Sequence, residues 1–208
     1  MMRRLRSVVA RVVDPTADAL LRAGIHPDAV TVAGTVGVVV AALVLLPLGH
    51  LVAGPLVITV FALTDLLDGT MARRSGRVSP WGAFLDSTLD RFGDGAIFAG
   101  LVVYLAGRGD DQVGAALALA ALVLGSIVPY ARARAEGLGM RADVGIAERA
   151  DRLLAVLLST FVVGLGAPAG LLTVVLGLLA LASLVTVVQR MAVVRRQALA
   201  AASGGGPA

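Results

Sequence analysis

The sequence predicts an all-α integral membrane protein, with six transmembrane helices preceded by an N-terminal amphipathic helix in the membrane interface. Hydrophobic residues make up 58% of the 208 residues and charged residues only 15%, whereas about a quarter of the residues in a soluble domain are charged. The mean hydropathy is +0.89. The apolar residues also occur in runs close to the roughly 20 residues that a helix needs to cross a bilayer. A polytopic membrane protein is therefore expected.

The N-terminal segment Met2–Ala23 predicts the amphipathic helix. Arginines and aspartates alternate there with leucines and valines, a pattern typical of a helix that lies flat in the interface. Arg11 interrupts the apolar run, and Asp14 and Pro15 end it. No cleavable signal peptide is expected from this pattern.

Short polar stretches divide the rest of the chain into six predicted spans, of which the fifth is short and is extended backwards by its polar start. The spans are Ala29–Leu51, Val52–Ala72, Gly82–Ala106, Val113–Ala131, Leu153–Ala167 and Gly170–Val188. We expect a single membrane domain over residues 1–198, with the amphipathic helix at 2–23 and the six-helix core at 29–190. The low-complexity end of the chain predicts a disordered tail at 199–208.

The loop arginines predict the orientation of the spans. Arginines are frequent before span one, between spans two and three, between spans four and five, and after span six. The opposite loops carry only His50, Arg108 and an uncharged turn. By the positive-inside rule, both termini and the charged segment 64–91 face the cytoplasm, in a multi-pass protein of the cell membrane.

The choice of residue types limits the chemistry. Cysteine is absent, so disulfides, thiol nucleophiles and thiolate metal sites are excluded, and any metal must bind to oxygen or imidazole. All 18 basic residues are arginine. Arginine is permanently charged, and its planar fork suits bidentate contact with phosphate.

Four aspartates mark the predicted functional site. Asp65 and Asp68 are three residues apart, and Asp86 and Asp90 are four apart, so each pair projects from one face of a helix. A short turn joins the two spans concerned, and antiparallel neighbours would bring the pairs together. Four carboxylates at a shallow membrane depth need compensating positive charge. With oxygen ligands alone, one or two Mg²⁺ or Mn²⁺ ions are the expected occupants, and a pair of such ions stabilises a transferring phosphoryl group.

Other interpretations of the aspartates are open at this point. They could form an interfacial charge network with nearby arginines, although such a network needs neither Gly69 beside Asp68 nor Gly82 four residues before Asp86. They could also bind the coupling ion of a small transporter, or belong to an inactive scaffold. A transporter would carry acidic residues through the span midplanes, whereas these are concentrated at one end of two spans.

The segment from Asp65 to Asp90 resembles the complete signature of the CDP-alcohol phosphatidyltransferases, with every spacing intact: Asp65-x2-Asp68-Gly69-x2-Ala72-Arg73-x8-Gly82-x3-Asp86-x3-Asp90. The resemblance covers nearly the whole chain. It implies that an acceptor hydroxyl attacks the lipid-side phosphorus of CDP-diacylglycerol and that CMP leaves. It also implies that Asp65, Asp68 and Asp86 are metal ligands, and that Asp90 is both a ligand and the general base.

The resemblance further implies a site for the nucleotide and pyrophosphate. The turn from His26 to Thr31 is similar to the family's nucleotide loop, in which an asparagine usually stands where this chain has Asp28. An aspartate there accepts hydrogen bonds but donates no amide proton. The residues expected to bind CDP-diacylglycerol are Asp28, Ala29, Val30, Thr31, Gly69, Arg73, Ser79 and Gly82.

The acceptor alcohol is predicted from weaker motifs. The segments YARARAE and ERADR, together with PDAVT, resemble the bacterial branch of the family in which 1D-myo-inositol 3-phosphate is the acceptor and phosphatidylinositol phosphate the product. The arginines expected to bind the acceptor phosphate are Arg132, Arg134, Arg152, Arg190 and Arg195, with Arg149 as a further candidate. Arg195 equally suits contact with anionic lipid. Glycerol 3-phosphate, which also needs phosphate-binding arginines, is the alternative acceptor.

The sequence also gives expectations for three further residues and for the binding partners of the protein. Asp94 is expected to pair with Arg91 or with an arginine of a neighbouring helix. Trp81 is expected at the membrane interface, and Pro129 either kinks span four or is a tolerated membrane proline. The resemblance implies a homodimer in contact with membrane lipid, and no nucleic-acid partner is expected.

Overall fold

The computed structural model describes residues 13–146 and 148–204, and no strand occurs within these ranges. Residues 13–22 are helical. The helices that follow are α2 (Pro27–Leu45), α3 (Ala53–Ala62), α4 (Thr64–Arg74), α5 (Pro80–Ala106), α6 (Gln112–Glu136), α7 (Arg149–Gly164) and α8 (Gly170–Gly204). The predicted all-α class is confirmed. The part of the amphipathic helix expected at 2–12 lies outside the described residues.

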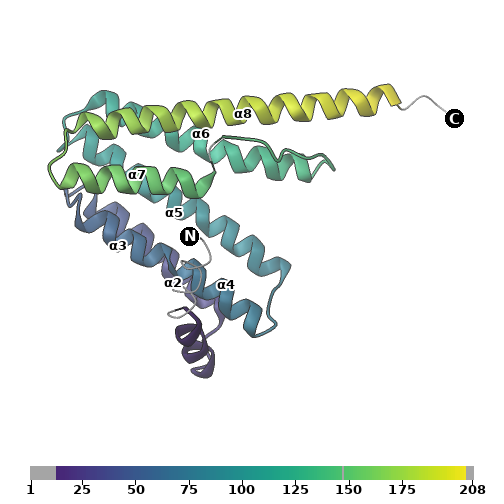
Figure 1. The fold of residues 1–208 in the computed structure, drawn as a ribbon, viewed down its shortest axis with the longest axis horizontal. Helices are drawn as coiled ribbons and strands as arrows, with labels where there is room; N and C mark the ends of the chain where they lie inside the picture. Colours follow the sequence, from purple (N-terminus) through teal and green to yellow (C-terminus); the bar gives the residue numbers. More distant parts are fainter. Residues whose placement is uncertain (1–12, 147, 205–208) are drawn as a thin grey trace, which may run out of the picture.

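The helices form two arms that meet at one end of the molecule and diverge at the other (Figure 1). The first arm contains α2, α3, α4 and the first half of α5, and the second arm contains α6, α7 and α8. The helix α5 packs against α2 in the first arm and against α6 in the second, and α6 packs along α8. The long helix α5 therefore connects the two arms.

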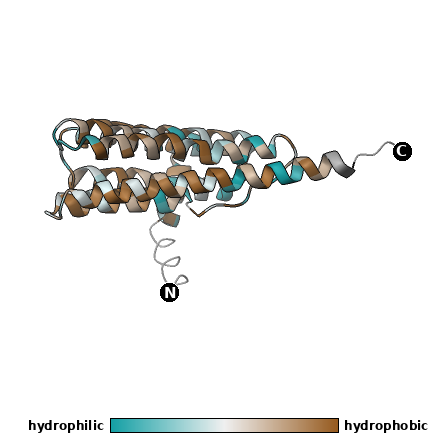
Figure 2. Ribbon diagram, turned by 90° about the horizontal axis from the view of Figure 1, so that it is seen from above, coloured by the Kyte–Doolittle hydropathy of each residue, from teal (hydrophilic) through white to brown (hydrophobic). Residues whose placement is uncertain are grey.

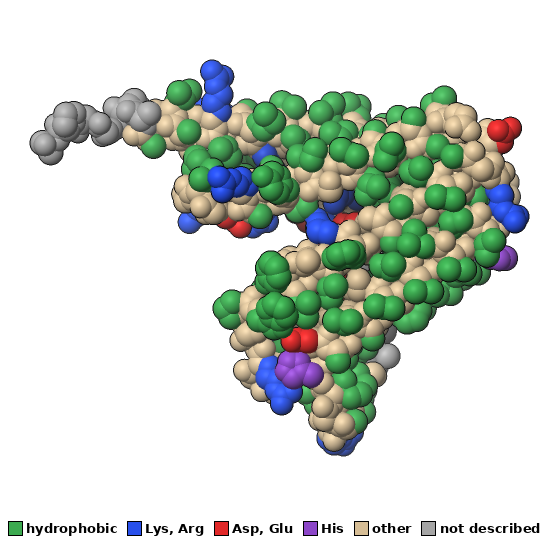
Figure 3. All heavy atoms as spheres, turned by 180° about the vertical axis from the view of Figure 1, so that it is seen from behind, with side chains coloured by type: hydrophobic (Ala, Val, Ile, Leu, Met, Phe, Trp, Pro, Cys, Tyr) green, Lys and Arg blue, Asp and Glu red, His purple; other side chains and the backbone are tan. Residues whose placement is uncertain are grey.

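The surface of the helices is largely apolar. Figure 2 shows hydrophobic colouring along most of the helices, and Figure 3 shows apolar side chains over both arms, with charged side chains in the hollow between them. Val36, Val60, Leu119 and Leu178 are examples of apolar side chains that are exposed on different helices. Such surfaces suit contact with lipid tails. The protein is a multi-pass membrane protein.

Within the described residues, four segments are long and apolar enough to cross a membrane: Pro27–Leu45, Ala53–Arg74, Gln112–Glu136 and Gly170–Ala201. The two remaining predicted spans correspond to α5 and α7. The first half of α5 carries the aspartates of the motif, and α7 has only 16 residues, with charged residues in its first turn. The count of six spans stays a prediction.

Small residues allow α2 to approach α4 and α5 closely. A side chain at Gly100 of α5 would collide with the backbone of Ala42 in α2, and one at Gly34 of α2 would collide with Thr64. Lipid tails are as apolar as the helix surfaces, so association in a membrane depends on such close packing. These contacts hold both α4 and α5 against α2.

The predicted second span is divided into two helices. The helix α3 ends at Ala62 and α4 begins at Thr64, with Leu63 between them at φ −68° and ψ −12°. The Leu63 N–H donates to the carbonyl oxygen of Thr59, so the chain continues in the same general direction. The short helix α4 thus carries Asp65 and Asp68 as a separate segment.

The C-terminal helix is longer than expected. The helix α8 continues to Gly204 and enters the segment 199–208 for which the sequence predicts disorder. Alanines dominate this stretch, and alanine has the highest intrinsic helix propensity. The disordered tail predicted at 199–208 and the domain limit at 198 stay predictions, although the structure draws residues 199–204 as helix.

Candidate active site

A tight turn places α4 beside α5. The helix α4 ends at Arg74, Gly76 adopts a φ of +66°, and α5 begins at Pro80. The side chain of Ser79 caps α5 by accepting a hydrogen bond from the N–H of Gly82 at 3.1 Å. A proline in the first turn and a serine cap are both strong signals for the start of a helix. The reversal brings the carboxylates of the two helices face to face, as the sequence predicts.

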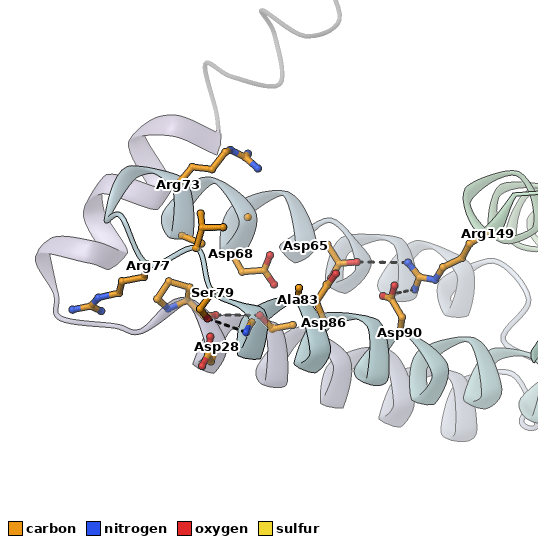
Figure 4. Close-up of a pocket in the computed structure, with 16 residues that line it drawn as sticks. Asp28, Asp65, Asp68, Arg73, Arg77, Ser79, Ala83, Asp86, Asp90 and Arg149 are labelled. Carbon is orange, nitrogen blue, oxygen red and sulfur yellow. Dashed lines mark hydrogen bonds and ion pairs between the residues drawn. The ribbon is translucent and has the colours of Figure 1, made fainter. Parts of the chain in front are cut away.

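Three of the four predicted metal ligands lie together. Asp65, Asp68 and Asp86 each offer one carboxylate oxygen, and these three oxygens lie within 4.8 Å of one another. Figure 4 shows the three side chains pointing into one space between α4 and α5. Asp68 is only 7% exposed. Its Oδ2 atom is buried without a hydrogen-bond partner among the described residues.

The cluster fits a divalent cation. Buried carboxylate oxygens are costly without a partner, and two further carboxylates lie close to that of Asp68. An all-oxygen donor set is the one that Mg²⁺ and Mn²⁺ prefer. Asp65, Asp68 and Asp86 would therefore hold the ion.

Asp90 lies at the edge of this cluster and is paired with an arginine. Its Oδ1 is 2.9 Å from Nη2 of Arg149, which comes from the first turn of α7. The same guanidinium contacts Asp94 through Nε at 2.9 Å and approaches Asp65 at 3.9 Å. The structure thus brings Asp90 to the site but directs its carboxylate to a cation of the second arm.

A cavity of about 540 Å³ adjoins the aspartates. Six of the residues expected to bind CDP-diacylglycerol line it, whereas Ala29 and Val30 do not. The predicted residues on its wall are Asp28, Thr31, Asp65, Asp68, Gly69, Arg73, Ser79, Gly82, Asp86 and Asp90. The nucleotide motif and the aspartate motif, which are separate in the sequence, therefore form one site.

The first turn of α2 is fixed at the cavity by polar contacts. The His26 ring caps α2 by accepting a hydrogen bond from the N–H of Asp28 at 3.3 Å. The indole N–H of Trp81 donates to Oδ2 of Asp28 at 3.2 Å. This bond joins the start of α2 to the start of α5. Trp81, which the sequence places at the membrane interface, also positions Asp28.

The arginines expected to bind an acceptor phosphate do not line this cavity. Arg132 pairs with Glu136 at 2.9 Å and with Asp143 at 3.0 Å. Arg190 donates to two backbone carbonyls. Arg152 is buried, whereas Arg134 and Arg195 are exposed. The predicted pocket is thus distributed over the second arm, and Arg132, Arg152 and Arg190 are engaged with the protein itself.

The arginines on the cavity wall are Arg73, Arg77 and Arg149. The sequence reasoning missed Arg77 and ranked Arg149 behind Arg152. A helical signal was available for Arg149, since it lies three residues before Arg152 and shares a face of α7 with it. Asp94 contacts both of these arginines, as its interpretation as an arginine partner predicts.

Comparison with known proteins agrees with the signature. Residues 24–145 match the model of the CDP-alcohol phosphatidyltransferase family. The chain belongs to this family. The matched range includes the aspartates, the turn before α2 and every cavity residue except Arg149, so the structural site and the family motif coincide.

Relatives match the chain over most of its length. It is 50% identical over 203 residues to the phosphatidylinositol phosphate synthase of Cutibacterium acnes, covering 94% of this chain and 98% of that protein. It is 46% identical over 198 residues to the phosphatidylinositol phosphate synthase of Streptomyces avermitilis, covering 92% of this chain and 81% of that protein.

Solved structures are similar to most of the chain. The crystal structure of Mycobacterium tuberculosis phosphatidylinositol phosphate synthase with CDP-DAG bound has a TM-score of 0.85 and 43% identity, covering 89% of this chain and 94% of that chain. The structure of the same enzyme in complex with manganese and citrate has a TM-score of 0.84 and 42% identity, covering 88% of each chain.

Membership of the family answers the open question about the aspartates. The protein is a CDP-alcohol phosphatidyltransferase, a phosphotransferase that uses a divalent cation such as Mg²⁺ or Mn²⁺. Charge compensation by arginine still occurs, because Arg149 pairs with Asp90 and Asp94. The charge network is thus an addition to the metal site and does not replace it.

Proposed function

We propose that the protein transfers a phosphatidyl group from CDP-diacylglycerol to a hydroxyl of 1D-myo-inositol 3-phosphate, giving phosphatidylinositol phosphate and CMP. The observation that carries this proposal is the continuous cavity shared by the aspartate cluster and the predicted nucleotide residues. It is supported by the 43% identity to an enzyme of Mycobacterium tuberculosis whose structure holds CDP-DAG.

The aspartates hold the metal in this proposal. Asp65, Asp68 and Asp86 supply the first ligands, and Asp90 joins them when two ions are bound. The ions supply positive charge that neutralises the pyrophosphate and stabilises the charge developing in the transition state. Most of the remaining catalysis comes from positioning, since the two substrates must meet in line at one phosphorus.

Asp90 removes the proton of the acceptor hydroxyl. It lies four residues beyond Asp86 on α5 and therefore projects from the same helix face. Its carboxylate lies on the cavity wall. The hydroxyl oxygen attacks the lipid-side phosphorus, the bond to the CMP oxygen breaks, and the proton passes to Asp90.

The nucleotide occupies the wall formed by α2, α4 and the turn before α5. Arg73 is exposed and holds its guanidinium near Thr70, so it can turn to a phosphate. Asp28 and Thr31 approach from the first turn of α2, where Ala29 and Val30 supply backbone. Gly69, Ser79 and Gly82 leave space for the ribose and the pyrophosphate.

The acceptor phosphate is bound from the second arm. Arg132, Arg152 and Arg190 come from three successive helices, α6, α7 and α8. Each would exchange an internal partner for the phosphate when substrate arrives. Arg134 and Arg195 lie nearer the surface and contribute to attraction of the anion.

The proposal includes the membrane context. The arginine-rich loops support a cytoplasmic position for the site and both termini. The proposed protein has six spans in the plasma membrane and forms a dimer. Amphipathic residues before α2 would lie in the interface, close to the lipid substrate.

The test is CMP release by purified protein with CDP-diacylglycerol and Mg²⁺. Inositol 3-phosphate, free inositol and glycerol 3-phosphate are compared in parallel. We expect turnover with inositol 3-phosphate alone. Turnover with glycerol 3-phosphate would favour the alternative acceptor, and CMP release that needs no acceptor would contradict the transfer reaction.

A further inference from the structure

Arg149 occupies an unusual position between the two arms. It is the first residue of α7, in the second arm, and its guanidinium reaches carboxylates of both α4 and α5 in the first arm (Figure 4). Its Nε is 2.9 Å from Asp94, and its Nη2 is 2.9 Å from Asp90. Arginine presents its donors in a rigid fork, so one side chain serves three carboxylates at once.

The position matters because Asp65 is shared. Asp65 belongs to the three-carboxylate cluster and also lies 3.9 Å from Nη1 of Arg149. A divalent cation in the cluster would place two positive charges within several ångströms of the guanidinium. At such separations, and with an effective dielectric of about 20, like charges repel strongly. The ion and the guanidinium therefore compete for the same carboxylates.

We infer that Arg149 is an exchangeable counter-ion of the metal site, which neutralises Asp65 and Asp90 before the metal binds and moves away from them when it does. This inference rests on the proposed metal-binding role of the aspartates. Arg149 is a positioning residue in this scheme, because it acts through the carboxylates.

Asp94 supplies the place to which the guanidinium moves. The side chain of Asp94 is only 13% exposed, and it accepts a hydrogen bond from Nε of Arg149. Asp65 is instead approached by Nη1 of the same guanidinium. The second oxygen of Asp94 lies 3.8 Å from Arg152. Arg149 therefore keeps one ion pair when it leaves Asp90. Asp90 then has only the 3.8 Å contact with Arg91, and its carboxylate becomes available to the metal and the acceptor proton.

A merely structural ion pair predicts a different result from a competing one. Removal of a structural arginine would loosen the site and weaken metal binding. Removal of a competing arginine would tighten metal binding, because Asp65 and Asp90 would lose their pairing with Arg149. Asp90 would then keep only the longer contact with Arg91, at 3.8 Å. The sign of the change in metal affinity separates the two cases.

The experiment uses the full-length protein in detergent, without substrate, and measures the dissociation constant of Mn²⁺ by electron paramagnetic resonance. Arg149→Gln should bind Mn²⁺ at least about tenfold more tightly than the wild type. The thermal midpoint of Arg149→Gln should be lower than that of the wild type without metal, and it should rise more than that of the wild type on addition of Mn²⁺.

The matched control is Arg141→Gln, since the Arg141 side chain is exposed and it is the backbone of Arg141 that bonds to Gln197. The control should leave the dissociation constant within about twofold.

A second variant keeps the inference testable if Arg149→Gln does not fold. Asp94→Asn removes the alternative ion pair, so the guanidinium stays on Asp90 and Asp65, and Mn²⁺ should bind more weakly. Weaker or unchanged Mn²⁺ binding in Arg149→Gln would overturn the inference while leaving the metal site intact. Tighter or unchanged binding in Asp94→Asn would also overturn it. Absence of Mn²⁺ binding by the wild type would overturn the proposed metal site together with the inference.

Discussion

The guanidinium of Arg152 donates a hydrogen bond to the carbonyl oxygen of Gly125, with 2.9 Å between Nη1 and the oxygen. In a regular helix this carbonyl would accept a bond from the N–H of residue 129. Residue 129 is a proline inside α6 and has no N–H. Pro129 therefore frees an acceptor for Arg152, which is only 4% exposed. An arginine at this depth is tolerated because its charge has a carbonyl and Asp94 nearby.

Gly125→Ala should destabilise the protein. The new Cβ would lie 3.0 Å from Nη1 of Arg152 and 3.4 Å from its Cζ. Arg152 cannot move freely, because Gly125 and Asp94 hold its guanidinium. We expect a loss of about 1–3 kcal/mol, typical of overpacking, measured as a lower thermal midpoint in detergent.

The control for this prediction is Gly95→Ala on α5. Gly95 lines a small pocket together with Gly125 and Arg152. A Cβ at Gly95 would meet no described atom of another segment within 4 Å. Alanine in a helix interior is favoured over glycine by up to about 1 kcal/mol. This variant should therefore be as stable as the wild type or more so. Equal destabilisation by both variants would show that the Arg152 contact is not the cause.

Asp90→Asn should abolish turnover and leave the fold intact. The amide cannot take the proton of the acceptor hydroxyl, and loss of a general base typically costs a factor on the order of 10² to 10⁴ in rate. The three-carboxylate cluster does not include Asp90, so Mn²⁺ should still bind. CMP release and Mn²⁺ binding are measured on the same preparation.

The matched control is Asp151→Asn, which makes the same change at an exposed position of α7. It should keep wild-type turnover. An Asp90→Asn protein that retained full activity would remove Asp90 from the role of general base.

Much of the site was predictable because its chemistry is local in sequence. Asp65, Asp68 and Asp86 lie on two helices joined by one short turn, so helical spacing is enough to bring them together. The partner of Asp90 was not predictable in this way. Arg149 is 59 positions further along the chain, and only the packing of α7 against the first arm brings it to Asp90.

The helix ends show the same distinction between local and tertiary effects. The start of α5 follows from Ser79 and Pro80, which are local signals. The break at Leu63 has no proline or glycine beside it, and it coincides with the close contact of Thr64 with Gly34 of α2. The sequence of the span alone gives no reason to divide it there.

Asp111→Ala should lower stability at neutral pH by about 1 kcal/mol, as expected for loss of an N-cap. Asp111 caps α6, since its Oδ1 accepts the N–H of Gly114 at 2.7 Å, and its Oδ2 accepts a hydrogen bond from Thr173 of α8. Thermal unfolding in detergent at pH 7 measures the loss. Asp111→Asn should keep most of the cap, because asparagine is an equally good N-cap residue.

The same residue predicts a pH dependence. The Thr173 hydroxyl and the Gly114 N–H hold the pKa of Asp111 below its ordinary value of 3.8. A group whose folded pKa is lowered stabilises the protein above its unfolded pKa, and this contribution is lost as the pH falls through the folded value. The difference in thermal midpoint between wild type and Asp111→Asn should therefore be constant at neutral pH and shrink below about pH 4. A difference that grew on acidification would have the wrong sign.

Arg74→Ala should release the helical segment 13–22 from the end of α4. Arg74 forms ion pairs with Asp14, at 3.3 Å, and with Asp18, and it also donates to the backbone carbonyl of Asp14. Exposed ion pairs are screened by salt, so the wild type at high salt should behave like the variant. Hydrogen exchange of residues 13–22 should be faster in Arg74→Ala than in the wild type at low salt, and similar in the two proteins at about 1 M salt.

Arg22→Ala, at an exposed position within the same segment, is the control and should exchange like the wild type at low salt. If exchange in Arg74→Ala equalled that of the wild type at low salt, the segment would have to be held by its apolar contacts, among them the fully buried Ala17.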